Sequence, residues 1–218
     1  MAGTAGPTAA LAGVPTGLQA QGVWVGRRQL FIRFAAEAET ATMYTAQAIA
    51  QEMVRGSKRS VFHSISVSGR DPLGNVEFLK AAFESTKPPL PVMLDIDGQR
   101  PESIEPLKKH VALVQITLES AMMEAHAERA MTALESAAKA GLDHALVLSP
   151  GEQTSDGQML RIVEHAHGAS EKTVVVIHPP YNIPIDRDRR WVTLLERSTA
   201  LHGDVRLSLR LPPPTGTR

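Results

Sequence analysis

The chain has 218 residues, in which 23 Lys and Arg are balanced by 23 Asp and Glu, and it contains eight His but no cysteine. A balanced charge gives no general attraction to nucleic acid or anionic membrane, because affinity for phosphate polymers comes mainly from excess basic side chains. Without cysteine the chain forms no disulfide, thiolate nucleophile, cysteine-ligated zinc site or cysteine-held iron–sulfur cluster. It also lacks an apolar run of the length that spans a bilayer.

The first 17 residues, MAGTAGPTAALAGVPTG, are uncharged and consist almost wholly of Ala, Gly, Thr and Pro. They lack the basic n-region and apolar core of a secretory signal. Their composition predicts an extended or flexible N-terminal tail over residues 1–17, which a partner would hold more readily than the chain's own core. We expect residues 18–218 to form a single domain, since this length suits one hydrophobic core.

Short apolar runs then alternate with stretches of helical period. In chain order, we predict a strand over 29–34, a helix over 42–55, a strand over 62–68, a helix over 75–84, a strand over 91–96, a helix started by Pro101, a strand over 112–118, a long Ala-rich helix that ends at Gly141, a strand over 144–149, a helix over 155–165, a strand over 173–177, a helix that contains Trp191, and a last strand over 204–210.

This alternation predicts an α/β fold with parallel strands joined by right-handed crossovers, because a hairpin cannot join a parallel pair. Six strand–helix units and a final strand fit a partial (β/α)6 barrel. A doubly wound open sheet fits nearly as well, since the period does not reveal closure. Either architecture would place a ligand site at the carboxyl ends of the strands.

Four motifs lie in order on these elements. The segment LQAQGVWVGRRQLFIRF covers residues 18–34, SGRDPL follows the second strand, LDIDG ends the third, and DVRLSLRLPPPTGTR closes the chain. Together they resemble 7-carboxy-7-deazaguanine synthase and its relatives in the radical S-adenosylmethionine superfamily, which have a QGEG turn and FIRF-type strand, a GGEPL motif, a TNG-type turn and a DVR…PQTHK segment. The resemblance extends from about Val14 to Arg218 and implies a radical S-adenosylmethionine-like partial barrel.

The same resemblance shows which reactive groups of the family are missing. The family's CxxxCxxC loop holds a 4Fe–4S cluster that chelates S-adenosylmethionine, and it falls on Glu37, Ala41 and Tyr44. The metal-binding threonine of the family falls on Ala46, and its closing histidine falls on Pro212. We therefore expect a degenerate, non-catalytic member that carries no iron–sulfur cluster and does not bind S-adenosylmethionine.

Five polar residues remain as candidates for residual ligand binding: Gln19, Arg33, Asp71, Asp97 and His178. Gln19 lies in the QGEG-like turn, Asp71 keeps the charge of the GGEP glutamate, and Asp97 follows the third strand. Arg33 also suits a structural ion pair, and His178, before two prolines, also suits a rigid loop. The histidines show no HExxH or other recognisable ligand spacing, so we expect no metal site.

A charged run near the C-terminus contains Arg187, Arg189, Arg190 and Trp191. Its ordinary interpretation is a solvated helix start. It is also a candidate interface, since Arg and Trp are enriched where proteins bind one another.

These observations favour a pseudoenzyme that acts as a structural or interaction subunit of a larger protein assembly. Its expected partners are other protein subunits, engaged through the tail and surface patches, with a homodimer as a further option and no nucleic acid. Its expected location is the cytoplasm or the periphery of a larger or membrane-bound complex. The alternative is a protein that binds S-adenosylmethionine or a pterin-like compound in a reduced pocket, and a third hypothesis is an enzyme that uses His178 or Asp71 without radical chemistry.

Overall fold

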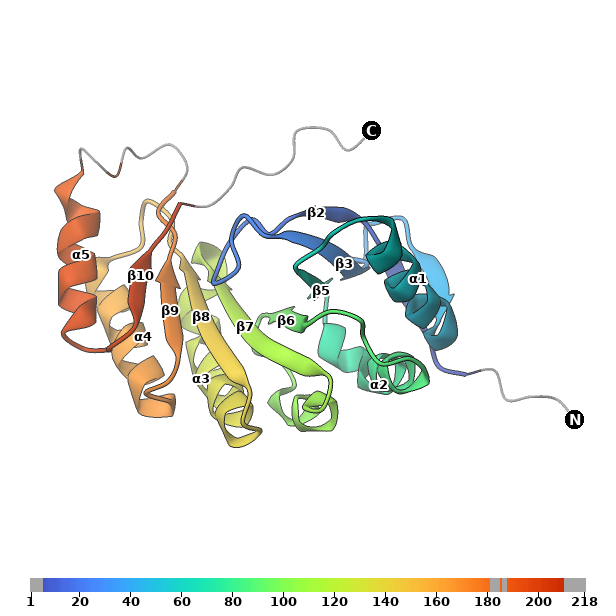
Figure 1. Ribbon diagram of the computed structural model, residues 1–218. Helices are drawn as coiled ribbons and strands as arrows, with labels where there is room; N and C mark the ends of the chain where they lie inside the picture. Colours follow the sequence, from blue (N-terminus) through green and yellow to red (C-terminus); the bar gives the residue numbers. More distant parts are fainter. Residues whose placement is uncertain (1–5, 181–184, 186–187, 210–218) are drawn as a thin grey trace, which may run out of the picture.

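The computed structural model describes residues 6–180, 185 and 188–209, which form a mixed α/β fold around a ten-stranded, mostly parallel sheet (Figure 1). Its parallel strands are β3 (Arg28–Phe34), β5 (Ser64–Gly69), β6 (Val92–Ile96), β7 (Val111–Glu119), β8 (Asp143–Ser149), β9 (Val174–Ile177) and β10 (Val205–Leu207). They lie side by side in chain order. A doubly wound sheet reverses its strand order at a switch point, and these strands show no such reversal.

The helices are α1 (Ala46–Arg59), α2 (Val76–Ser85), α3 (Met123–Lys139), α4 (Asp156–Ala169) and α5 (Arg189–Thr199). Figure 1 shows them following one another along the outer side of the curved sheet. Their apolar residues pack against alternate strand residues, such as Leu94 and Ile116, in one large buried cluster. Within the described part of the chain, no helix is both long and apolar enough to cross a membrane.

Residues 8–13 and 16–18 form strands of the sheet, which corrects the expectation of a separate tail for this part of residues 1–17. Strand β1 (Thr8–Gly13) pairs antiparallel with β3 on one side and with β4 (Thr42–Thr45) on the other, and β2 (Thr16–Leu18) pairs with β3. Leu11 is fully buried and Ala9 nearly so. Strand β1 lies between β3 and β4, so its small side chains are covered by these neighbouring strands.

Two predicted helices take other forms. The helix expected over 42–55 begins at Ala46, because residues 42–45 are the strand β4 and the Thr45 hydroxyl caps the helix by accepting a hydrogen bond from the Ala48 N–H at 3.1 Å. The segment started by Pro101 forms two 3₁₀ turns, Pro101–Ser103 and Glu105–Leu107. Pro106 has no N–H to continue an α-helix through this segment. The last strand covers three of the predicted residues, Val205–Leu207.

Candidate functional site

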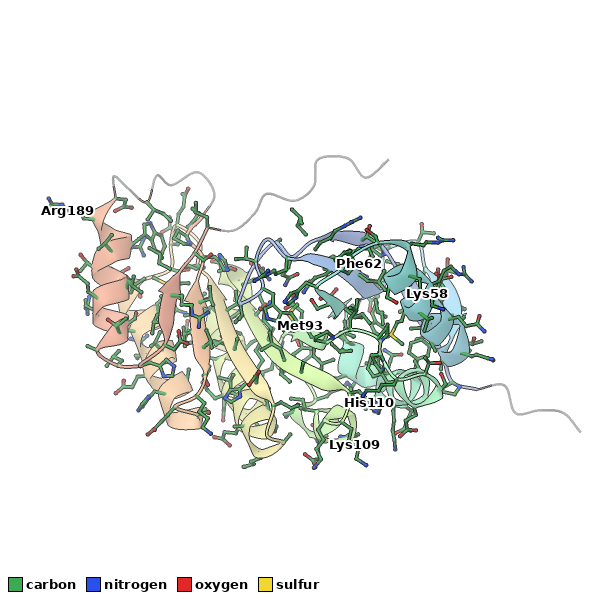
Figure 2. The ribbon with its side chains drawn as sticks, viewed as in Figure 1. Lys58, Phe62, Met93, Lys109, His110 and Arg189 are labelled. Atoms are coloured by element: carbon green, nitrogen blue, oxygen red, sulfur yellow. The ribbon has the colours of Figure 1, made fainter. Side chains whose placement is uncertain are left out.

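The face of the sheet opposite the helices carries the polar strand residues. Because side chains alternate along a strand, Val114 and Ile116 of β7 point to the helices, while Leu113, Gln115 and Thr117 point the other way. In β6, Met93 and Asp95 share that second face, and Figure 2 shows Met93 in the middle of the sheet. On both strands the apolar residues lie nearer the amino end and the polar residues nearer the carboxyl end.

A loop over residues 19–27 covers this second face, which we call the loop-covered face. The loop is closed by two main-chain hydrogen bonds: the Gln19 N–H donates to the Arg27 carbonyl at 2.9 Å, and the Gly26 N–H donates to the Gln19 carbonyl at 2.8 Å. Val23 and Trp24 pack on Met93 and on its apolar neighbours. The loop therefore lies on the sheet through an apolar contact as well as through polar ones.

Four hydrogen bonds fix the loop to polar side chains of the loop-covered face. Gln19 Nε2 donates to Asp95 Oδ2 at 3.2 Å, Gln21 Nε2 donates to Thr117 Oγ1 at 3.3 Å, the Gly22 N–H donates to His178 Nε2 at 2.8 Å, and the Val23 N–H donates to Gln115 Oε1 at 3.2 Å. These acceptors come from three strands or strand ends that lie far apart in the sequence. The position of the loop on the sheet therefore depends on residues of the loop and on residues of these strands.

Gly22 is the point at which the loop lies closest to the sheet. It has a φ of +80°, a conformation that glycine adopts readily, and a Cβ placed on it would lie 1.8 Å from Gln115 Oε1. The close approach allows the main-chain N–H of Gly22 to reach His178. A Cβ here would clash with the amide of the buried Gln115 side chain, so either that side chain or the loop would have to move.

Asp95 lies at the centre of the polar contacts. Its Oδ1 accepts a hydrogen bond from Thr117 Oγ1 at 3.0 Å, in addition to the bond from Gln19. Burial raises the pKa of Asp95, and the charge of Glu119 acts in the same direction, while hydrogen bonds from Gln19, Gln115 and Thr117 partly offset that rise. The Asp95 carboxyl group therefore holds a proton to a higher pH than an exposed aspartate does.

His178 and Gln19 are the two predicted site residues that the structure brings to this loop. His178 is nearly fully buried at the end of β9, and its Nε2 must be unprotonated to accept the Gly22 N–H. Its own main-chain N–H donates to the Leu148 carbonyl at 2.8 Å. Both residues therefore contact the chain itself, in the region where a ligand was expected.

The other three candidates lie in separate ion pairs. Arg33 Nη1 is 2.6 Å from Glu39, Asp71 is 3.0 Å from Arg100 Nε, and Asp97 is 2.7 Å from Arg129 Nη2. For Arg33, the ion pair with Glu39 agrees with the structural role that its position also suggested. Asp71 additionally caps the turn after β5 by accepting from the Gly74 N–H at 3.0 Å.

The three positions at which the resemblance places the family's cysteines have dissimilar surroundings. Glu37 is exposed and pairs with Arg70, whose hydrogen bond and charge lower the pKa of Glu37. Ala41 is exposed before β4, and Tyr44 lies within β4, opposite Ala9 of β1. No group of His, Asp or Glu side chains suited to a metal ion occurs among the described residues.

The candidate interface at the start of α5 does not hold for two of its four residues. Trp191 is fully buried, and Arg190 is tied by its Nε to Asp156 at 2.7 Å and by its Nη2 to the Thr154 carbonyl at 2.6 Å. The indole fills the space between α5 and the sheet, so it offers no surface to a partner. Arg189 is exposed and points away from the molecule (Figure 2), and Arg187 lies outside the described residues.

A cavity of about 300 Å³ lies beside the loop, at the amino ends of the strands. Its apolar walls include Val23, Trp24, Leu113 and Val174, and Lys172 lies at its border. Sequence reasoning placed a ligand at the opposite ends of the strands and missed this cavity. It also missed Gln115 and Thr117, although two polar residues inside the otherwise apolar run ALVQITL were a visible signal.

Comparisons with known proteins give one partial sequence match. The chain is 29% identical over 102 residues to the 7-carboxy-7-deazaguanine synthase of Methanothermobacter thermautotrophicus, and the match covers 40% of this chain and 40% of that protein. The match thus spans less than half the length of the relative. No protein-family model matches the chain.

Two solved structures align with most of the chain at TM-scores below 0.5. One is the 3-keto-D-glucoside 4-epimerase YcjR from E. coli, with a TM-score of 0.44 and 13% identity, covering 85% of this chain and 81% of that chain. The other is a truncated 3-deoxy-D-arabino-heptulosonate 7-phosphate synthase from Thermotoga maritima, with a TM-score of 0.38 and 10% identity, covering 84% and 82%.

Proposed function

We propose that this chain is a non-catalytic relative of 7-carboxy-7-deazaguanine synthase, in which a radical S-adenosylmethionine-like partial barrel serves as a structural or interaction subunit of a larger protein assembly. The sequence match to the synthase and the strands in unbroken chain order support the relationship. The lack of cysteine in the chain supports the loss of the cluster-dependent reaction, since the family's cluster is held by three thiolates.

One observation carries the proposal: the chain's own loop occupies the loop-covered face near the carboxyl ends of the strands. Barrel enzymes keep that end of the strands open for substrate. Here Gln19, Gln21 and Gly22 bind the polar side chains that would otherwise face a ligand. The loop makes an apolar contact and four hydrogen bonds with this face, and Gly22 lies close to β7. We infer that these contacts take the place of a ligand.

The alternative is a protein that binds a small polar molecule. One feature favours it: the cavity of about 300 Å³ beside Trp24, whose lining combines apolar side chains with the polar groups of Asp143, His144 and Lys172. Ligand pockets usually combine an apolar lining with a few such groups. Titration with S-adenosylmethionine distinguishes this alternative from the main proposal.

The assembly role is tested by the size of the native protein. The tagged chain, expressed in its own source and purified under gentle conditions, should elute in a complex much larger than its own 23.5 kDa. The same chain purified alone gives the reference for the free form. Elution of the native protein entirely at the position of the free chain would rule out the assembly role.

A further inference from the structure

The two edges of the sheet differ in how they are protected from pairing with other strands. Natural edge strands usually carry charges, prolines or bulges that prevent unwanted pairing. At one edge, β10 has Arg206 at its centre, paired with Asp204 at 2.8 Å. At the other edge, β4 has the sequence TMYT, with no charge and no proline. The edge at β4 therefore lacks charge and proline, and its short length of four residues is what limits strand addition there.

The pairing of β4 with β1 shows which main-chain groups face outward. The Ala46 N–H donates to the Pro7 carbonyl at 3.1 Å, and the register continues with Thr45 opposite Thr8 and Tyr44 opposite Ala9. In an antiparallel pair, every second residue directs its N–H and C=O to the partner strand. Tyr44 therefore faces β1, and the N–H and C=O of Met43 and the N–H of Thr45 face the free edge, where no described strand pairs with them. The C=O of Thr45 belongs to the first turn of α1, because Thr45 is the N-cap of that helix.

The side chains around this edge are uncharged over an unusual length of sequence. No Lys, Arg, Asp or Glu occurs in residues 1–26 or in residues 40–51, although such residues make up 21% of the chain. β1 and β4 pair these two uncharged segments side by side, at the end of the sheet beside α1 (Figure 1). Met43 is 64% exposed, and its cross-strand neighbour Ala10 is also exposed. An exposed, uncharged ribbon of this kind is what an added strand requires.

We propose that the free edge of β4 binds an extended segment of another protein subunit by strand addition, with Met43 as the apolar contact. This inference rests on the proposed role as an interaction subunit and names the surface that carries it. Main-chain hydrogen bonds to Met43 and Thr45 would provide affinity, and the alternate side chains would provide specificity. A charged residue in the incoming strand opposite Met43 would remain without a counter-charge, so the partner segment is uncharged there.

A second copy of this chain is a poorer occupant of the same edge. β4 contains four residues, about 13 Å of strand at roughly 3.3 Å per residue. Pairing of two such edges would bury far less than the roughly 1,200 Å² at which stable interfaces begin. The edge is adequate as one part of a larger contact within an assembly, where further surface is buried elsewhere.

Two substitutions test the edge without altering the pairing to β1. Met43→Pro removes the outward N–H, a position where an edge strand tolerates proline, and Met43→Lys adds the charge that protected edges usually carry. Val61→Lys is the matched control, because Val61 is 89% exposed in the loop after α1, away from the edge. Unchanged thermal unfolding midpoints of the purified variants would show that the fold is intact.

The readout is the native size of each tagged variant in the source cells. We expect wild type and Val61→Lys in the large complex and both Met43 variants at the position of the free 23.5 kDa chain. Retention of both folded Met43 variants in the complex would overturn the edge inference alone. A wild-type chain that is free in the cell would overturn the proposed function itself. Dimerisation of the purified chain that Met43→Pro abolishes would also overturn the inference, by identifying a second copy as the occupant.

Discussion

Gly22 is the residue on which the closure of the loop-covered face depends most directly. Gly22→Ala places a methyl group 1.8 Å from Gln115 Oε1 and also forces a non-glycine residue to a φ of +80°. The backbone strain alone costs about 1–2 kcal/mol, and displacement of the loop adds the loss of its hydrogen bonds. We therefore expect a loss of unfolding free energy of about 3 kcal/mol or more in urea titration.

Gly26 supplies the matched control for this prediction. It has a φ of +77°, almost the same as Gly22, but a Cβ there meets nothing within 4 Å. Gly26→Ala should therefore show the backbone cost of about 1–2 kcal/mol without the clash. Equal losses for the two variants would mean that the close contact between the loop and β7 does not hold in solution.

Asp95 gives the loop-covered face a defined pH dependence. Because the pKa of Asp95 is raised in the folded chain, the folded state binds more protons than the unfolded state above the ordinary value of 3.8. The Asp95 contribution to stability must therefore fall as the pH rises from the ordinary pKa through the raised one. At lower pH, where the carboxyl group is protonated in both states, this cost disappears.

The test compares wild type with Asp95→Asn, which stays uncharged at every pH and keeps one of the two acceptor oxygens of the side chain. The difference in unfolding free energy between them should change with pH, increasingly in favour of the asparagine variant as the pH rises from about 4. Subtracting the two pH profiles removes the opposing contribution of exposed groups such as Glu37. A difference that stays constant, or that grows in favour of wild type, would contradict the assignment.

Strand β1 contributes a buried residue to the core from a segment whose composition suggested a flexible tail. Leu11 is fully buried between neighbouring strands, so Leu11→Ala should cost about 2–5 kcal/mol of unfolding free energy. Leu18, in the same N-terminal segment, is 57% exposed, and Leu18→Ala should stay within about 0.5 kcal/mol of wild type. If the Leu11 variant is as stable as the Leu18 variant, the segment is a tail after all.

Helix α5 permits a parallel test of whether its aromatic residue belongs to the core or to an interface. Trp191→Ala should lower the unfolding free energy by about 3–5 kcal/mol, since a fully buried indole is removed. Arg189→Ala, at an exposed neighbouring position, should have almost no effect. Chemical denaturation of both variants measures the difference, and a small cost for the Trp191 change would restore the interface interpretation.

The elements that sequence reasoning located well are those whose pattern is local. The apolar run of β7 and the helical period of α4 each contain enough information to predict a buried strand or an amphipathic helix. The strands β1 and β4 do not, because their stability comes from pairing with each other across about 30 intervening residues. A segment of Ala, Gly and Thr has no period that distinguishes a covered strand from a flexible tail.

The candidate site shows the same division. The motif QAQG identified Gln19, and the position of His178 after a strand identified that residue as well. That Gln19 binds Asp95 and that His178 binds the Gly22 N–H depends on how the loop folds back over β6, β7 and the end of β9. Hydrogen bonds between residues as far apart as Gly22 and His178 leave no signal in one sequence.

At the scale of the whole molecule, the two proposals have a common physical basis. The loop over residues 19–27 fills the face that an enzyme of this architecture would leave open, and the uncharged edge at β4 provides a surface for another protein. In the proposed role, the interior near the strand carboxyl ends would serve stability, and the exterior would serve association. If this proposal holds, the interior accepts neither S-adenosylmethionine nor an iron–sulfur cluster.

Calorimetric titration with S-adenosylmethionine, after anaerobic incubation of the purified chain with iron and sulfide, tests this claim most directly. The 7-carboxy-7-deazaguanine synthase of Methanothermobacter thermautotrophicus, treated in parallel, serves as the comparison. We predict no bound iron–sulfur cluster and no heat of binding at millimolar S-adenosylmethionine. Saturable binding of one S-adenosylmethionine per chain, with or without a cluster, would contradict the account.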